Sequence, residues 1–226
     1  MAVVALLLVV APTASASPSP KTLRSPYAGY GYGYESGYFD GCGGSALFAK
    51  TPYFNATNGH GYALVQSNSS SCGKIASDSE AYSEAEFEIS SLTLPSGHGS
   101  IRERWSATFS FNLVAHPGKR GSADAYVAIF LYSYLYDATN HTYAASSYTN
   151  PFYNSTTSGT LAASYSGVSM VDYVNGTFAS GHTYYLYLQF ELEAYSEASS
   201  KIASAGAVIN CGTSGNSAKL TSITVP

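Results

Sequence analysis

Apolar and polar side chains alternate along several long stretches of this chain. In 183–195 every second residue is apolar, and mostly tyrosine, glutamine and glutamate occupy the positions between. The stretches 101–115, 125–136 and 85–89 alternate in the same way. A period of two is typical of β-strands with one buried and one exposed face. The pattern therefore predicts antiparallel sheets packed in two layers.

Turn signals separate these stretches. His116-Pro117-Gly118, Asn175-Gly176 and Ser180-Gly181 interrupt the alternation, and Asn-Gly is the strongest short hairpin signal. The intervals between turns correspond to roughly nine strands. We predict an all-β fold, an antiparallel two-sheet β-sandwich of jelly-roll type, with 101–115 and 183–195 as central strands.

Composition supports a single folded domain. The chain has 226 residues, of which 45% are hydrophobic, and it contains 21 tyrosines and 21 glycines. Charged residues make up 11% and the net charge is −4. A chain with so few basic residues offers no stripe for a phosphate backbone, so nucleic acid is not an expected partner.

The first 46 residues differ from the rest. The apolar run 2–11 followed by Ala14-Ser15-Ala16 predicts a signal peptide over 1–16, and hence a secreted or cell-surface protein. No later run is long enough for a transmembrane anchor. The segment 17–46 is rich in Gly, Tyr and Pro and predicts a flexible tether, or alternatively an adhesive arm. The sandwich is expected over 47–226.

Secretion changes the interpretation of the cysteines and asparagines. Three cysteines suggest one disulfide, predicted as Cys42–Cys72, although Cys211 could pair with either. No cysteine spacing fits a zinc site. Five Asn-x-Ser/Thr sites are candidates for glycosylation: Asn55, Asn68, Asn140, Asn154 and Asn175.

Two glutamates are candidates for catalysis. Glu191 and Glu193 share one face of a predicted strand, roughly 6–7 Å apart by strand rise. Glycoside hydrolases use two carboxyl groups about 5–10 Å apart. The alternative is a solvated face in which the glutamates meet cross-strand partners such as Arg102 and Arg104.

The histidines point to no site. All five occupy turn-like segments without metal-ligand spacing, so neither a metal nor a cofactor is expected.

Tyrosines suggest a binding surface. Five of them lie opposite the apolar face of their predicted strands: Tyr132, Tyr134, Tyr136, Tyr185 and Tyr187. Tyrosine is also a good strand former, which explains part of the enrichment. If the strands are neighbours, the rings form a platform suited to stacking on sugars. We therefore expect a non-enzymatic binding or structural module whose partner is a glycan or a surface protein. The alternatives are a glycoside hydrolase and a self-assembling surface-layer or matrix protein.

Overall fold

The computed structural model describes residues 19–27, 29–41, 43–71, 75–199, 202–212 and 215–226, and within them it contains β-strands but no helix. The described residues form twelve strands: β1 (Lys21–Leu23), β2 (Gly29–Asp40), β3 (Ser45–Asn55), β4 (His60–Ser70), β5 (Ser77–Leu92), β6 (Gly97–His116), β7 (Ser122–Asp137), β8 (Thr142–Thr156), β9 (Gly159–Phe178), β10 (Tyr184–Ser199), β11 (Ser204–Asn210) and β12 (Ser217–Val225). The all-β prediction is confirmed, but the predicted count of about nine is too low, because strands near both chain ends lack a clear alternation of polarity.

The strands form two antiparallel sheets. One sheet has the order β2-β5-β10-β7-β8, and the other β1-β12-β4-β11-β6-β9 with β3 paired to β4. The pairs are nested: β7 with β8, β6 with β9, β5 with β10 and β4 with β11. Successive nested pairs alternate between the sheets, which is the jelly-roll arrangement. As predicted, β6 and β10 are central strands.

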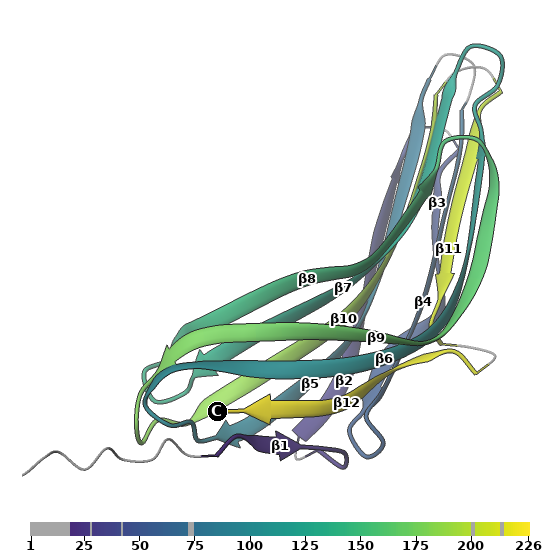
Figure 1. The fold of residues 1–226 in the computed structure, drawn as a ribbon. Helices are drawn as coiled ribbons and strands as arrows, with labels where there is room; N and C mark the ends of the chain where they lie inside the picture. The colour runs from purple at the N-terminus through teal and green to yellow at the C-terminus, as the bar shows by residue number, and fades with distance from the viewer. Residues whose placement is uncertain (1–18, 28, 42, 72–74, 200–201, 213–214) are drawn as a thin grey trace, which may run out of the picture.

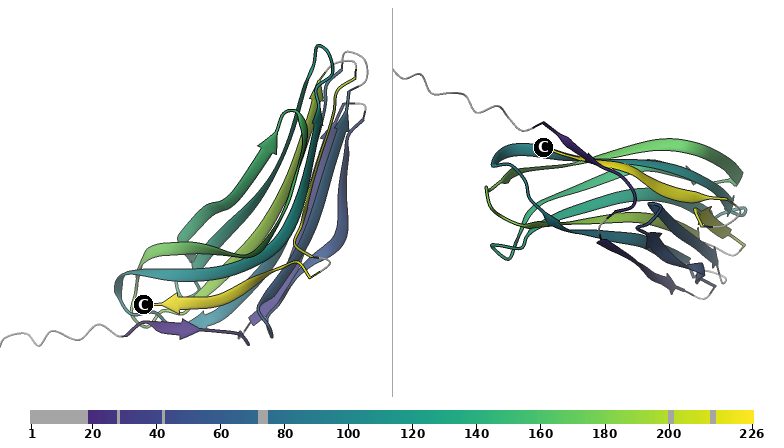
Figure 2. Two further views of the ribbon diagram at one scale, coloured as in Figure 1. Left: turned by 45° about the vertical axis from the view of Figure 1, so that its right-hand side comes forward. Right: turned by 90° about the horizontal axis from the view of Figure 1, so that it is seen from below.

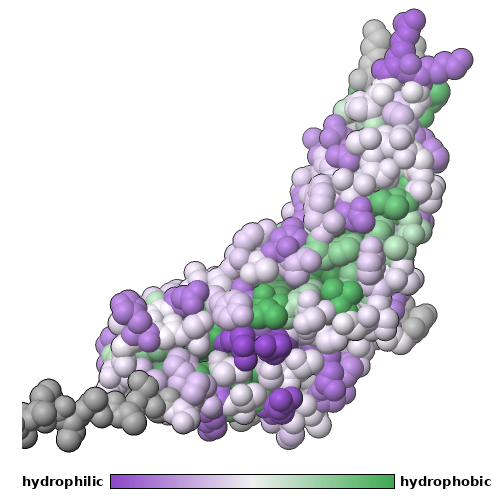
Figure 3. All heavy atoms as spheres, in the orientation of Figure 1, coloured by the Kyte–Doolittle hydropathy of each residue, from purple (hydrophilic) through white to green (hydrophobic). Residues whose placement is uncertain are grey.

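The sandwich is bent along its length, so that two arms meet at an angle (Figures 1 and 2). β8 follows the inner side of the bend in Figure 1. Register shifts occur within β6–β9, between Ala107 and Phe109, and within β7–β8, between Ile129 and Leu131. Such bulges bend a strand locally. Apolar residues reach the surface along the bend (Figure 3). Phe152 of the edge strand β8 is paired with Ile129, next to the register shift, and packs against the core while only partly buried.

The core lies between the sheets and follows the predicted alternation. Trp105 and Phe109 of β6 and Leu188 and Phe190 of β10 are fully or almost fully buried. The rings of Trp105 and Phe190 stack across the sheets with centroids 5.8 Å apart. Full burial of one such side chain stabilises the fold by roughly 1.5–3 kcal/mol. The period of two therefore identifies the residues that hold the sheets together.

The Gly/Tyr-rich segment is a strand and not a tether. Residues 29–40 form β2, which pairs along its whole length with β5. A Cβ added at Gly31 or Gly33 would lie 2.1 Å from the carbonyl oxygen of Phe54 or 1.8 Å from that of Pro52, respectively. Glycine is required there because the backbone of β3 packs directly against β2. The prediction of flexibility is wrong for these residues, since the alternating Gly and Tyr mark the inner and outer faces of a strand.

A polar cluster interrupts the apolar core. Glu103 of β6 and Asp172 of β9 are paired directly across the seven-stranded sheet and are almost fully buried. Hydroxyl groups of the opposite sheet donate hydrogen bonds to Asp172: Thr149 at 2.6 Å, Ser133 at 3.2 Å, and Ser147. Burial and the Asp172 charge raise the pKa of Glu103 to about 8, although a hydrogen bond with Ser133 acts in the opposite direction. Glu103 is therefore protonated at neutral pH.

The predicted disulfide Cys42–Cys72 lies outside the described residues. Their neighbours are close together, since the amide of Ser70 donates to the carbonyl oxygen of Gly43 at 3.0 Å. Cys211 is buried as a free thiol, and burial raises its pKa above the ordinary value. The alternative pairing through Cys211 is therefore not found, and the Cys42–Cys72 bridge stays a prediction.

Candidate functional site

The outer surface of the five-stranded sheet brings tyrosines and glutamates together, and we name it the tyrosine–glutamate face. Its residues point away from the core on all five strands. They are Tyr32, Tyr34 and Tyr38 on β2; Glu80, Tyr82, Glu84, Glu86 and Glu88 on β5; Tyr185, Tyr187, Gln189, Glu191, Glu193 and Tyr195 on β10; Tyr126, Tyr132, Tyr134 and Tyr136 on β7; and Tyr143, Tyr148 and Tyr153 on β8.

The register brings the five predicted tyrosines to one place. Tyr187 lies directly opposite Tyr134, and Tyr185 opposite Tyr136. Tyr132 lies on the same face, opposite Gln189. All five are half-buried. β8 adds further rings at the edge, including Tyr143, which is 71% exposed. The sequence placed the five tyrosines on one face correctly, although their role as ligand-binding residues remains a hypothesis.

A groove runs over this part of the face. It has a volume of about 660 Å³ and is lined by Tyr32, Tyr134, Tyr143, Ser146, Tyr187 and Gln189. Four strands contribute to it, so the register of the whole sheet fixes its shape. The Nε2 group of Gln189 donates to Glu86 Oε1 at 2.6 Å, which fixes the amide at the floor. The groove therefore combines aromatic walls with an oriented polar group.

Carboxyl groups form pairs between β5 and β10. Glu84 lies directly opposite Glu191, and their side chains are hydrogen bonded. Glu193, which lies opposite Tyr82, is hydrogen bonded to its diagonal neighbour Glu80 and also accepts a hydrogen bond from the Tyr126 hydroxyl. Each candidate catalytic glutamate is thus bonded to a glutamate of β5 that the sequence analysis did not single out. The sequence does contain a signal for these partners, because glutamates occupy alternate positions in most of 80–88 and therefore point to one face of a strand.

The expected surroundings of these glutamates are wrong. Glu191 and Glu193 are only 8% and 6% exposed, because tyrosine rings enclose them, so the face around them is not simply solvated. Arg102 and Arg104 belong to β6 in the other sheet and face Tyr173 and Val171 of β9. A single sequence shows which way a side chain points along its strand, but not which strand lies beside it.

The pairing raises carboxyl pKa values on this face. Burial, the hydrogen bond to Glu84 and the charges of neighbouring glutamates raise the pKa of Glu191 to about 8. Burial and Glu80 raise that of Glu193 to about 7, and burial and Glu84 raise that of Glu86 to about 7. Like charges at short distance favour sharing of one proton. At neutral pH the row is therefore partly protonated.

Glu80 behaves in the opposite way. Burial acts to raise its pKa, but hydrogen bonds from Glu193, Tyr82, Tyr38 and Tyr126 outweigh this effect and hold the pKa below its ordinary value. Glu80 is therefore the ionised member of its pair, and Glu193 carries the proton.

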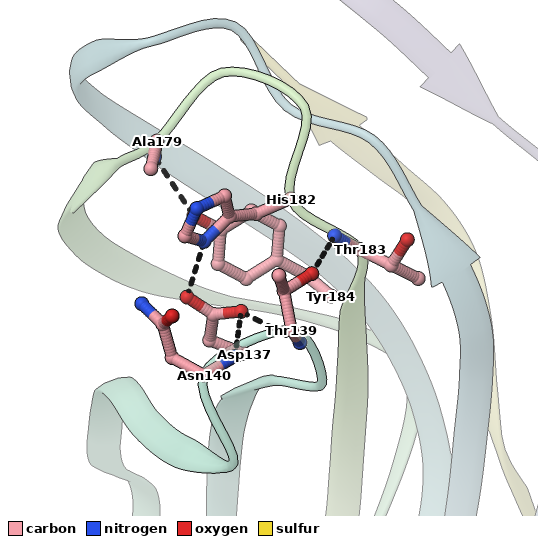
Figure 4. A network of polar contacts seen from close by, with 7 residues as sticks. All are labelled: Asp137, Thr139, Asn140, Ala179, His182, Thr183 and Tyr184. Carbon is pink, nitrogen blue, oxygen red and sulfur yellow. Dashed lines mark hydrogen bonds and ion pairs between the residues drawn. The ribbon is translucent and has the colours of Figure 1, made fainter.

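His182 is a half-buried residue that ties two turns together (Figure 4). Its Nδ1 lies 2.7 Å from Asp137 Oδ2. Asp137 Oδ1 accepts from the amides of Thr139 and Asn140 at 3.0 and 3.1 Å. Burial opposes ionisation of Asp137, but these hydrogen bonds hold its pKa below the ordinary value. The contacts join the β7–β8 turn to the β9–β10 turn, which is a structural role.

Metal and membrane features are absent from the described part of the chain. No group of three or more His, Cys, Asp or Glu side chains there has a geometry that could hold a metal ion. In the same residues, no helix has the length and apolar character to cross a membrane.

The candidate glycosylation sites lie on different strands. Asn140 is in the exposed β7–β8 turn, and Asn175 is exposed within the edge strand β9. Asn55 ends β3, while Asn68 and Asn154 lie near the ends of β4 and β8, and these three are half-buried. Their glycosylation stays a prediction.

Comparisons with known proteins assign no family. No protein-family model matches the chain, and no curated protein matches it. A solved structure described as TmCBM61 in complex with β-1,4-galactotriose matches at 9% identity, covering 74% of this chain and 83% of that chain, with a TM-score of 0.17. A TM-score that low carries no argument about ligand or function.

Proposed function

We propose that this chain is an extracellular, non-enzymatic glycan-binding protein whose binding site is the tyrosine–glutamate face. The observation that carries the proposal is the groove lined by Tyr32, Tyr134, Tyr143 and Tyr187 over the oriented amide of Gln189. The signal-like segment 1–16, which lies outside the described residues, supports the extracellular location.

The chemistry of the groove suits sugars. A pyranose ring presents flat C–H faces that pack on aromatic rings, and hydroxyl groups that need hydrogen-bond partners at its edge. Tyrosine supplies an apolar ring together with a polar hydroxyl. The Gln189 amide and neighbouring carboxyl groups supply further donors and acceptors. A contiguous aromatic surface that remains partly exposed is typical of a binding surface.

The test is depletion of the protein from solution by insoluble polysaccharides. The double variant Tyr134→Ala/Tyr187→Ala removes two facing rings, and we expect the binding constant to fall at least about fivefold, since each lost aromatic contact contributes about 0.5–1.5 kcal/mol. Tyr173→Ala is the matched control, because Tyr173 is 49% exposed on the other sheet. Unchanged retention in the double variant, with an unchanged melting temperature, would refute the proposed site.

Hydrolysis is opposed by the geometry. Glu191 has the raised pKa of a general acid. Its carboxyl group is nevertheless hydrogen bonded to Glu84, and both members of the predicted pair, Glu191 and Glu193, are only 8% and 6% exposed beneath tyrosine rings. We expect no reducing ends to be released from any polysaccharide that the protein binds. Release that disappears in Glu191→Gln would overturn this expectation and establish the enzyme alternative.

Self-assembly is a second candidate, supported by the sheet edges. Residues 142–178, which contain the edge strands β8 and β9, include one charged residue, Asp172, and it is buried. Edge strands without charged side chains can pair with another chain. Sedimentation velocity over a range of protein concentrations tests this candidate. A monomer at all concentrations would eliminate it.

A further inference from the structure

Charge is divided unevenly between the two sheets. The sequences of β2, β5, β7, β8 and β10 contain no Lys or Arg, although the chain has 10 such residues. These strands hold twelve of the 14 acidic residues: Glu35, Asp40, Asp78, Glu80, Glu84, Glu86, Glu88, Asp124, Asp137, Glu191, Glu193 and Glu197. One of them, Asp137, is paired with His182. The five strands of this sheet therefore carry acidic side chains and no basic ones, and the charge of the sheet is negative even with part of its carboxyl groups protonated.

The acidic residues adjoin the groove. Glu86 is bonded to Gln189 in the groove floor, and Glu84 and Glu191 form the next cross-strand pair along the same strands. At the far end of the sheet, Asp78 lies opposite both Asp40 and Glu197. A ligand lying along the strands from the groove would pass over carboxyl groups for most of its length.

Aromatic rings and carboxyl groups can bind the same cation together. The face of a tyrosine ring attracts an ammonium group, and a carboxylate nearby adds a charge-assisted hydrogen bond. An acidic glycan would be repelled by this surface, and a neutral glycan would gain nothing from the charge. A polymer of amino sugars with free amino groups matches both features, since each unit has an apolar ring face and a positive charge.

We propose that the tyrosine–glutamate face selects positively charged, amine-bearing glycans over neutral and acidic ones. This inference rests on the proposed glycan-binding function and names its ligand class. The negative field also speeds the approach of a cationic polymer and weakens with added salt.

The affinity should rise with pH if the carboxyl groups contribute. Burial and neighbouring glutamates raise the pKa values of Glu86 and Glu193 to about 7 and that of Glu191 to about 8. As the pH rises through this range these groups lose protons and the face becomes more negative. The groups that face them are carboxyls and tyrosines of β2, β5 and β7, with no Lys or Arg on those strands.

The experiment compares four soluble sugar polymers by calorimetry on the full chain. They are fully deacetylated glucosamine polymer, its N-trimethylated form with a permanent charge, its N-acetylated neutral form as short oligomers, and polygalacturonate. We expect the two cationic polymers to bind at least about fivefold more tightly than the neutral one, with no binding of polygalacturonate. For the N-trimethylated polymer, affinity should rise between about pH 6 and about pH 9.

Variants separate specific recognition from general charge attraction. Glu84→Gln/Glu191→Gln should lower the preference for cationic polymers, whereas Glu35→Gln, whose side chain alternates away from the tyrosines in β2, should not. Tyr134→Ala/Tyr187→Ala should lower the affinity for every polymer by at least about fivefold. Cationic binding at unchanged affinity after this tyrosine change overturns the inference, because charge alone would then explain it.

The outcomes distinguish the inference from the function on which it rests. Binding of the neutral or acidic polymer at equal or higher affinity overturns the cationic preference but leaves glycan binding in place. Binding of no polymer, extended to a panel of insoluble polysaccharides, overturns both.

Discussion

The outer faces of the two sheets have the same kind of hydrogen-bonded ladder but very different side chains. The five-stranded sheet presents large tyrosine rings and paired carboxyl groups. The seven-stranded sheet presents mainly short polar side chains such as Ser110 and Asn112 of β6 and Gln66 of β4. A groove of about 400 Å³ on that second face contains Gly206 and no aromatic side chain.

This difference shows which positions of the strands determine the binding properties of a sandwich. The inner residues of both sheets are similar, because both must fill one apolar core. Only the alternate positions are free to differ. One sheet uses them for a continuous set of tyrosine rings and paired carboxyl groups, while the other carries mainly small polar side chains with a few tyrosines and arginines among them. Fold and binding surface therefore depend on separate halves of the same strands.

The largest expected effect on stability comes from the inner side of β2, where Gly31 and Gly33 pack against β3. Gly33→Val should destabilise the protein by about 3 kcal/mol, since its Cβ would lie 1.8 Å from the carbonyl oxygen of Pro52 and force β3 away. Tyr34→Ala, on the opposite side of β2, should cost far less because Tyr34 is 56% exposed. Chemical denaturation measures both. Equal losses would show that the two sides of β2 do not differ.

A smaller effect concerns a carboxyl group that belongs to neither outer face. The folded-state pKa of Glu103 is about 8 against an ordinary 4.5, so its contribution is fully present below about pH 4.5 and is lost as the pH rises toward 8. The slope is at most about 1.4 kcal/mol per pH unit. Glu103→Gln should make the fall of melting temperature with pH shallower.

Glu86, Glu191 and Glu193 also have raised pKa values, so part of the wild-type fall should remain in that variant. The control is Glu35→Gln, which removes a carboxyl group from an exposed position. A Glu103→Gln profile identical to that of the wild type would show that Glu103 is already ionised in the fold.

The smallest effect is expected on the outer face of the seven-stranded sheet. Arg104 is exposed and its side chain has no recorded ion pair among the described residues. Arg104→Ala should change stability by no more than about 0.5 kcal/mol, as for most surface substitutions, and should leave glycan retention intact. A large loss of retention would mean that both faces of the sandwich bind ligand.

The sequence predicts more of the fold than of the site. The period of two identifies the buried residues of β6, β7 and β10 because every inward position there must be apolar. The same rule places Tyr134 and Tyr187 on one face. It does not show that they are opposite one another, because strand order depends on contacts between distant segments.

Two features were missed for related reasons. The Gly/Tyr alternation of β2 was interpreted as a tether because glycine contributes no apolar bulk to the pattern. The Glu84–Glu191 pair is not predicted because its members are more than one hundred residues apart in the sequence. In addition, the usual expectation for a glutamate on an outer face is an oppositely charged cross-strand partner, and not a second carboxyl group.

The nested pairing of strands also determines how the chain can fold. Closing a loop costs more entropy as the loop lengthens, so the β7–β8 hairpin at the centre of the nested pairs, which like β3–β4 has a short turn, forms at low cost. Each surrounding pair then closes on a structure already made, and the last, between Lys21 and Val225, joins the two ends of the described chain. During synthesis, β4 therefore cannot pair with β11, nor β5 with β10, until most of the chain has been made. Such a topology favours slow folding after synthesis is complete.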